Sequence, residues 1–242
     1  MRCWGKQRTT PVFSGLIPAG LFDFIKEAFM LVACMIDGGF FQKKVFGIKR
    51  PEPVTADDVI QCCKNLFNDE EFQGDTLFRI FYYDCYPAEG SATNPISGKT
   101  LDFSDAPVSR YRRNFLDDLK LKPRVALRLG ELITTGWKIP QNRTREIIDK
   151  IETGQHLQED DVHLDFTQKQ VDIKVGLDIA WLSGKRIVDK IILVTGDSDF
   201  IPAMKYARKE GAMVFLAPLG HYPLREGLQE HCDGIIDMVY PG

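Results

Sequence analysis

The stretch Lys190–Gly211, KIILVTGDSDFIPAMKYARKEG, decides the fold class of this chain. Its opening residues, Ile191 to Val194, form an apolar run that is too short for a helix and has the length of a buried strand. Gly196 then permits a tight turn, and Pro202 falls in the first turn of a following helix, where its missing N–H costs nothing. Residues 212–217 are predicted to be the next strand. A strand, a helix and a second strand in this order predict a parallel sheet.

Two carboxylates, Asp197 and Asp199, follow the first strand of this unit directly. Open α/β sheets bind their ligands at the carboxyl ends of their strands. Two neighbouring acids destabilise a fold through mutual repulsion unless a cation or a basic partner joins them. Ser198 lies between them, at the edge of the predicted site, and either Ser198 or Asp199 can cap the helix that follows.

The same arrangement of a strand followed by an acid occurs twice earlier in the chain. The apolar run Phe29 to Ile36 predicts a buried strand, and Asp37 follows it. The run Leu77 to Tyr83 predicts a second strand, and Asp84 follows that one. Because the carboxyl ends of parallel strands meet at one edge of a sheet, we expect these acids to lie close to Asp197. Taken alone, Asp37 is better explained as a turn residue that caps the next helix.

The helix predicted over Gln168 to Ser183 leads into the strand of the opening unit. Its apolar face consists of four side chains at helical spacing: Val171, Val175, Ile179 and Leu182. Asp172 lies one position from that face, whereas Asp178 lies about 240° further round the helix at 100° per residue. A regular helix cannot present both acids to one small site. Asp172 is therefore the predicted member of the site, and Asp178 either lines its edge or is solvated.

Other segments give weaker predictions. Lys43 to Pro53 is predicted to be a basic loop, and Thr55 to Asn68 an amphipathic helix that opens with a capping box of Thr55 and Asp58. Near the C-terminus, Pro223 to His231 predicts a last helix and Gly234 to Val239 a last strand.

Residues 85–165 do not continue the alternation of strands and helices, and we interpret them as an inserted subregion. The region is rich in Lys and Arg, with Tyr111 and Trp137 interleaved. Cations for phosphates and rings for bases suit a single-stranded nucleic acid. A solvated helix face balanced by neighbouring acids explains the pattern equally well. The arginines that the first interpretation assigns to RNA binding are Arg110, Arg112, Arg113 and Arg128.

The net charge of −3 over 242 residues excludes a uniformly basic nucleic-acid coat but leaves room for a local basic groove. No apolar run approaches the length of a membrane span, so we expect no membrane partner. The cysteines form no CxxC pair and no zinc-ligand spacing with histidine. A reducing, cytoplasmic setting follows as the simplest prediction.

Acids that gather at one edge of a parallel sheet cannot all stay ionised without compensation. Carboxylates alone are ligands for hard divalent cations, which here means Mg²⁺ or Mn²⁺. Such a cation can activate water as a nucleophile and stabilise charge that develops on phosphate. The chemistry indicated by the residues is the hydrolysis of a phosphodiester.

Four segments carry a resemblance to the NYN domains of the PIN-like nuclease superfamily, in the LabA-like branch. These segments are CMIDGGFF (34–41), RIFYYD (79–84), KQVDIKVGLDIAWLS (169–183) and ILVTGDSDFIPAMKYARKEGAMVFL (192–216). The resemblance implies a Rossmann-like three-layer α/β sandwich with a mostly parallel sheet, and metal-dependent ribonuclease activity. By motif position it implies that the metal ligands are Asp37, Asp84, Asp172 and Asp197, with Asp199 and Asp178 beside them. Gly39 and Phe40 stand where many relatives carry Asn or Ser shortly after the first acid.

These observations together predict an extension over residues 1–28 and a single NYN domain over 29–242. The predicted function is a metal-dependent endoribonuclease acting on single-stranded RNA, with the catalytic acids Asp37, Asp172, Asp197 and Asp199. A non-catalytic RNA-binding or regulatory module of the same fold is the alternative. A phosphatase of the haloacid dehalogenase type is excluded, because it needs an acid where Gly39 stands. The sequence sets no oligomeric state and leaves a homodimer open.

Overall fold

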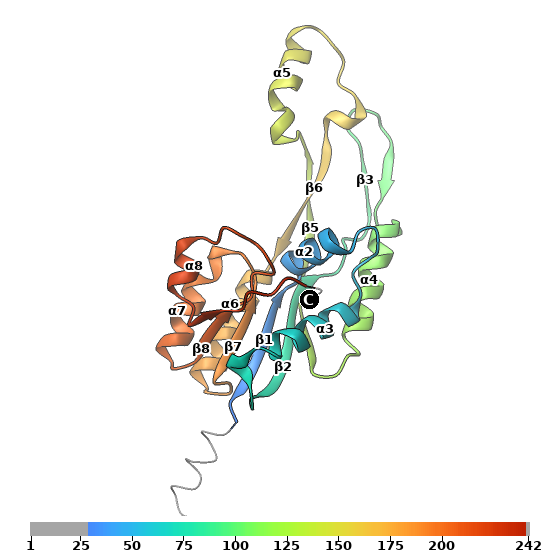
Figure 1. Ribbon diagram of the computed structural model, residues 1–242. Coiled ribbons are helices and arrows are strands. Elements are labelled where there is room, and N and C mark those ends of the chain that lie inside the picture. The colour runs from blue at the N-terminus through green and yellow to red at the C-terminus, as the bar shows by residue number, and fades with distance from the viewer. Residues whose placement is uncertain (1–28, 241–242) are drawn as a thin grey trace, which may run out of the picture.

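The computed structural model describes residues 29–240, and its centre is a seven-stranded sheet (Figure 1). The strand order is β6-β5-β2-β1-β7-β8-β9, and every neighbouring pair is parallel except β5 with β6. The strands are β1 (Leu31–Asp37), β2 (Thr76–Cys85), β5 (Val125–Lys138), β6 (His163–Lys169), β7 (Lys190–Val194), β8 (Met213–Leu216) and β9 (Gly234–Ile235). The predicted α/β class with a mostly parallel sheet is confirmed, whereas the predicted extension over 1–28 lies outside the described residues.

Helices cover both faces of the sheet. Alternate residues of β1 point to opposite faces: Cys34 and Ile36 pack with one set of helices, and Ala33 and Met35 with the other. The first set is α2 (Gly38–Lys49), α3 (Ala56–Phe67) and α4 (Pro107–Leu119). The second set is α6 (Val171–Gly184), α7 (Ile201–Lys209) and the short α8 (Glu226–Glu230). Both faces of the central strands are therefore buried, which explains why those strands are continuous apolar runs.

The predicted capping box of α3 is present and forms part of a larger buried polar centre. Thr55 caps the helix, and Asp58 Oδ2 accepts hydrogen bonds from the Thr55 N–H at 2.6 Å and from Lys49 Nζ at 2.8 Å. Tyr240 Oη donates to Asp58 Oδ1 at 3.0 Å, which ties the end of the described chain to α3. Burial alone would raise the pKa of Asp58, but the bonds from Lys49 and Thr55 outweigh it and hold the pKa below its usual value.

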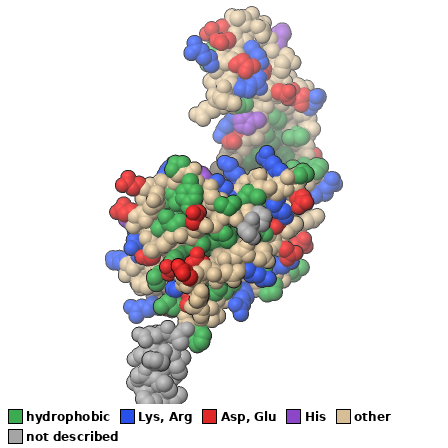
Figure 2. Space-filling model, viewed as in Figure 1, with side chains coloured by type: hydrophobic (Ala, Val, Ile, Leu, Met, Phe, Trp, Pro, Cys, Tyr) green, Lys and Arg blue, Asp and Glu red, His purple; other side chains and the backbone are tan. Residues whose placement is uncertain are grey.

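The strands β5 and β6 continue past the sheet as an arm, residues 131–169, that stands out as a separate lobe (Figures 1 and 2). The arm carries α5 (Thr144–Glu152) near its tip, and the hairpin of β3 (Ser91–Thr93) and β4 (Thr100–Asp102) lies beside it. The rings of Phe103 and Phe166 meet edge to face at 5.5 Å, and Asn94 Nδ2 donates to Glu159 O at 3.3 Å. These contacts join the hairpin to the arm.

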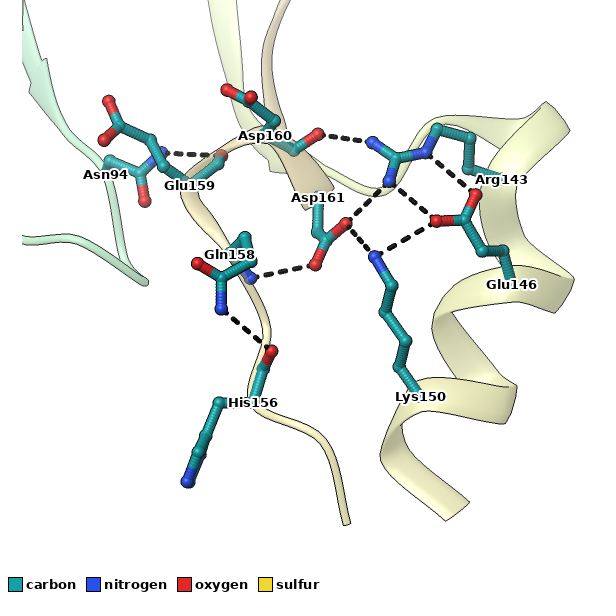
Figure 3. A network of polar contacts seen from close by, with 9 residues as sticks. All are labelled: Asn94, Arg143, Glu146, Lys150, His156, Gln158, Glu159, Asp160 and Asp161. Carbon is teal, nitrogen blue, oxygen red and sulfur yellow. Dashed lines mark hydrogen bonds and ion pairs between the residues drawn. The ribbon is translucent and has the colours of Figure 1, made fainter. Parts of the chain in front are cut away.

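Near the tip, the arm is held together by a buried carboxylate (Figure 3). Asp161 is 1% exposed and accepts from Arg143 Nη2 at 2.8 Å and Lys150 Nζ at 2.9 Å, both belonging to the segment around α5. The Gln158 N–H donates to the other carboxylate oxygen at 2.8 Å. The arm is thus stabilised by a satisfied ion network as well as by apolar packing.

Several predicted boundaries are wrong, among them that of the last helix, which is only Glu226–Glu230 instead of Pro223 to His231. Lys43 to Pro53 is not all loop, because α2 continues to Lys49; its exposed side is basic, so the helical pattern is weak. Gln168 and Lys169 end β6 instead of opening α6, and Gln170 marks the change of direction with a φ of 69°. The last strand is only the two residues of β9. Within residues 29–240, none of the helices combines the length and apolar character needed to cross a bilayer.

The buried centre at Asp58 gives a first prediction. We expect Asp58→Ala to lower the free energy of unfolding by about 3 kcal/mol, because it removes one half of the capping box and leaves the Thr55 N–H, Lys49 Nζ and Tyr240 Oη without their acceptor. Since the pKa of Asp58 is depressed in the folded state, its contribution is present above the ordinary Asp pKa and is lost as the pH falls through the folded value.

Urea unfolding at neutral and acidic pH measures this effect. The matched control is Asp57→Ala, because the neighbouring Asp57 is exposed and pairs with Lys122 at the surface, where an ion pair contributes about 0–1 kcal/mol. Equal effects of the two substitutions would contradict the assigned role of Asp58.

Candidate active site

Asp37 is the last residue of β1 and the cap of α2 at the same time. Its Oδ1 accepts from the Phe40 N–H at 3.1 Å, and its Oδ2 accepts from Thr195 Oγ1 at 3.2 Å. The interpretation of Asp37 as a helix cap is therefore correct, and the same side chain also points toward the residues that follow β7. The first turn of α2 and the residue that follows β7 hold the carboxylate in place.

The start of α2 packs closely on the end of β2. A Cβ atom on Gly38 would lie 2.6 Å from Tyr83 O and 2.8 Å from Asp84 Oδ2. Only glycine fits at this point, which is the physical reason for a glycine directly after Asp37. The close approach sets Asp84 beneath the first turn of α2.

The residues after β7 present the next pair of acids. The Asp197 N–H donates to Thr195 Oγ1 at 3.1 Å, so Thr195 contacts both Asp37 and the Asp197 backbone. Asp197 Oδ1 accepts from the Asp199 N–H at 3.0 Å and caps a short 3₁₀ turn. Ser198 Oγ lies 2.5 Å from Arg225 Nη1. Asp197 and Asp199 are both exposed on this edge.

Asp172, in the first turn of α6, completes this group. Burial raises the pKa of Asp172, and the charges of Asp197 and Asp199 raise it further. Burial also raises the pKa of Asp37, and the charges of Asp172 and Asp197 add to that rise against the hydrogen bonds from Phe40 and Thr195. The structure thus brings these four acids into one electrostatic group, here called the acid cluster: Asp37, Asp172, Asp197 and Asp199.

Asp84 lies near the end of β2, the strand beside the one that ends in Asp37, but its carboxylate has its own partner. It is fully buried, and its two oxygens accept from Arg112 Nη2 at 2.8 and 2.9 Å. The Cys85 N–H donates to Asp84 Oδ1 at 2.8 Å. Burial raises the pKa of Asp84, and Arg112 and the Cys85 N–H oppose that rise. A predicted metal ligand and a predicted RNA-binding arginine thus compensate each other inside the fold.

Asp178 lies away from the acid cluster, on the sheet-facing side of α6. Its Oδ2 accepts from Tyr83 Oη at 3.0 Å and from Arg128 Nε at 2.7 Å. The Arg128 guanidinium also stands 5.1 Å from the centre of the Phe81 ring. These contacts fasten α6 to β2 and β5, in agreement with the separate directions expected for Asp172 and Asp178.

The two remaining arginines of the predicted RNA-binding set form surface ion pairs. Arg110 pairs with Asp105 at 3.3 Å, and Arg113 pairs with Glu89 at 3.0 Å. Asp105 and Glu89 are 78% and 72% exposed, so these pairs exchange partners at little cost.

One group near the acid cluster has no signal in the sequence. A Cβ atom on Gly196 would lie 2.6 Å from His221 Cδ2 and 2.9 Å from Phe40 Cε2, so both rings pack on the backbone between Thr195 and Asp197. His221 has no partner at a recognisable spacing in the chain, and only the folded structure brings it to this edge.

The acid cluster fits a hard divalent cation by its chemistry, since all of its donors are carboxylate oxygens. Among residues 29–240, no three His, Cys, Asp or Glu side chains stand close enough together to surround an ion in their present rotamers. Asp172, Asp197 and Asp199 are exposed and can turn toward one ion, whereas Asp37 is held by Phe40 and Thr195.

A mostly parallel sheet with helices on both faces and acids at its carboxyl edge is the arrangement of the PIN-like nuclease class. The chain belongs to the NYN domain family, whose model matches residues 101–238. The match includes Asp172, Asp197 and Asp199, and it begins after Asp37 and Asp84. NYN domains are in general nucleases.

No curated protein matches the chain. A crystal structure of a protein of unknown function from Vibrio parahaemolyticus is similar to it, with a TM-score of 0.46 and 13% sequence identity. That similarity covers 86% of this chain and 91% of the Vibrio chain.

The Asp84–Arg112 pair gives a second prediction. We expect Arg112→Ala to lower the free energy of unfolding by about 3 kcal/mol at neutral pH, because it leaves a buried carboxylate without its counter-charge. The loss should shrink as the pH falls to about 4, because protonation of Asp84 then removes the uncompensated charge.

Chemical unfolding across this pH range tests the prediction, with Arg113→Ala as the matched control. Arg113 lies one position further along α4 and pairs with the exposed Glu89, so its removal should change stability by less than about 1 kcal/mol. A deficit for Arg112→Ala that does not vary with pH would argue against an ionised, compensated Asp84.

Proposed function

We propose that this protein is a metal-dependent endoribonuclease that hydrolyses phosphodiester bonds of single-stranded RNA. The proposal is supported by Asp37, Asp172, Asp197 and Asp199, which follow strands or open a helix at one edge of the sheet, and by the charges of Asp197 and its neighbours, which after burial raise the pKa values of Asp37 and Asp172. Within residues 29–240 no Lys or Arg side chain forms an ion pair with any of these four acids. An uncompensated group of carboxylates is suited to a cation supplied from solution.

Mg²⁺ or Mn²⁺ held by the acid cluster would lower the pKa of bound water and offset charge that develops on phosphate. Asp37 serves as the fixed ligand, because its two oxygens already accept from Phe40 and Thr195. Asp172, Asp197 and Asp199 are exposed and supply ligands that adjust to the ion. Asp84 lies behind Asp37, and a metal would have to compete for it with the Arg112 guanidinium.

RNA would be held by exposed cations of the inserted subregion. Arg110 and Arg113 can exchange their exposed acidic partners for phosphate oxygens, whereas Arg112 and Arg128 are occupied by Asp84 and Asp178. The arm shows side chains of both charges on the face seen in Figure 2, so RNA binding by the arm cannot depend on a uniformly positive surface.

Cys34 Sγ and Cys63 Sγ lie 3.4 Å apart as free thiols, which suits a reducing, cytoplasmic setting.

A non-catalytic RNA-binding module is the second candidate. The bidentate pair of Asp84 with Arg112 favours it, because that pair withdraws one acid from the set that the family resemblance assigns to metal binding. RNA cleavage distinguishes the two candidates directly.

The decisive experiment compares the parent protein with Asp197→Asn on labelled single-stranded RNA in Mn²⁺, Mg²⁺ or EDTA. We expect the parent protein to cleave RNA only when a metal is present. The cleavage rate of Asp197→Asn should be lower by at least about 100-fold, because the variant loses a carboxylate ligand of the metal; this loss corresponds to about 2.8 kcal/mol of transition-state stabilisation. The thermal midpoint should be unchanged or higher, because the substitution relieves repulsion within the acid cluster.

Asp118→Asn is the matched control, since Asp118 is an exposed acid on α4. It should cut RNA at the parental rate. Equal cleavage by the parent and Asp197→Asn would remove the acid cluster from the reaction. Binding without cleavage in any metal would favour the non-catalytic module.

A further inference from the structure

A pair of aromatic side chains borders the acid cluster and has no part in the function proposed so far. The rings of Phe40 and His221 meet edge to face, 5.8 Å apart with an interplanar angle of 82°. Phe40 stands in the first turn of α2, and its N–H donates to Asp37; His221 comes from the loop after β8, where its N–H donates to Pro218 O at 2.9 Å. Phe40 packs against the edge of the core, and both side chains keep part of their surface exposed.

The backbone at Gly196 makes this position possible. The distances of 2.6 and 2.9 Å from a Cβ at Gly196 to the two rings leave no room for a side chain there. The rings therefore lie against the chain between Thr195 and Asp197, which is the segment that presents the acid cluster. Whatever contacts these rings also lies beside Asp37 and Asp197.

Two lysines lie on the same border. Lys44 Nζ stands 5.7 Å from the centre of the Phe40 ring, one helical turn further along α2. Lys43 comes three residues after Phe40 on the same helix, which is within side-chain reach along a helix face, and after burial the charges of Lys44 and Lys43 lower the pKa of His221. Among the described residues neither lysine has an acidic partner within salt-bridge distance, in contrast to all four arginines of the predicted RNA-binding set.

We propose that Phe40, His221, Lys43 and Lys44 form a nucleotide subsite, in which the two rings contact one unpaired base and the lysines bind the adjoining phosphate. The inference rests on the proposed function, because it places this nucleotide next to the bond that the acid cluster would cleave.

The side chains of this proposed subsite fit a nucleotide better than a simple anion. Exposed aromatic rings bind the π-face or edge of a base, and a neutral imidazole offers one hydrogen-bond donor and one acceptor. Lysines are point charges suited to phosphate. A base in a duplex is stacked on both sides and cannot reach such rings, so the subsite selects a single strand. An acidic peptide would use the lysines but would have no need of the rings.

The test measures binding of a fluorescent single-stranded oligoribonucleotide by anisotropy, with the Asp197→Asn protein as background so that no RNA is cut. Phe40→Leu and His221→Ala should each weaken binding by about 5-fold to 150-fold, the equivalent of about 1–3 kcal/mol for a base contact. Phe46→Leu and His231→Ala are matched controls: Phe46 is an exposed ring on the same helix, and His231 lies beside Glu230 at the far end of α8. The affinity of both control variants should stay within about 2-fold of that of the background protein, which is a smaller change than the loss of one base contact would cause.

A scan of single abasic positions along the oligonucleotide separates the base from the phosphate. With the background protein, removal of the base at one position should weaken binding by a similar factor. With Phe40→Leu or His221→Ala added, removal of that base should no longer change the affinity. Replacing both lysines, Lys43→Gln with Lys44→Gln, should reduce the salt dependence by about two counter-ions per complex and weaken normal and abasic strands alike. Lys185→Gln with Lys209→Gln, at the opposite edge of the sheet, is the control pair. The lysine pair also keeps the test valid if a ring variant fails to fold, since both lysines are on the surface of α2.

Three outcomes would each overturn the subsite. The ring and lysine variants could bind RNA as tightly as the background protein, the affinity could be the same for every abasic position, or polyglutamate could compete as strongly as unlabelled RNA. Cleavage assays keep the two proposals distinguishable. If the parent protein cuts no RNA but the variants lose base-dependent binding, the subsite stands and the nuclease proposal fails. If the parent cuts RNA and the variants bind normally, the subsite alone fails.

Discussion

The parallel register of the three central strands is the constraint on which the rest of this structure depends. β1 lies between β2 and β7, with Asp37 paired to Tyr83 and Ile36 paired to Val194. At the same edge, β7 therefore ends one residue before the level of Asp37, and β2 ends two residues beyond it. A slip of one residue in any of them would exchange its side chains between the two helix layers, so the fit of these side chains into the two cores fixes the register. The acids after the strands are brought together as a consequence of this packing.

Compensation of charge separates the acids with structural roles from those of the acid cluster. Asp58 has Lys49, Asp84 has Arg112, Asp161 has Arg143 and Lys150, and Asp178 has Arg128. Each of these carboxylates is largely buried, and a buried charge without a partner would cost several kcal/mol. Over the described residues, the four acids of the acid cluster have no such partner, and the negative charges within the cluster add to the effect of burial in raising the pKa values of Asp37 and Asp172. This contrast, more than the number of acids, separates the proposed cation site from the ion pairs that stabilise the fold.

Local patterns in the sequence were sufficient to predict the elements that carry the site. Apolar runs predict β1, β2 and β7, the acids that follow them are placed by the rule for parallel sheets, and the spacing of Thr55 and Asp58 predicts a cap that the structure contains. The 100° advance per residue also predicts that Asp172 and Asp178 point apart, and Asp178 does lie with Arg128 and Tyr83. In each case, the physical cause is local or periodic.

What the sequence could not supply depends on contacts between distant segments. Arg112 lies 28 residues from Asp84, and nothing in that interval indicates that the two would form a buried pair. His221 comes to the acid edge only because Gly196 leaves room for its ring. The helix α2 extends through a lysine-rich stretch whose composition favours a loop.

The Asp84–Arg112 pair also changes the interpretation of the inserted subregion. Residues 85–165 are an interruption in the pattern of the chain, yet α4 lies within them and packs Phe115, Leu116 and Leu119 into the same core as Cys34 and Ile36. The same helix supplies the guanidinium that compensates Asp84. Only the arm projects from the body, while α4 is part of the core and of the support beneath the acid edge. Loss of α4 would therefore expose that core and leave the buried Asp84 without its counter-charge, so α4 is a condition for a stable acid edge.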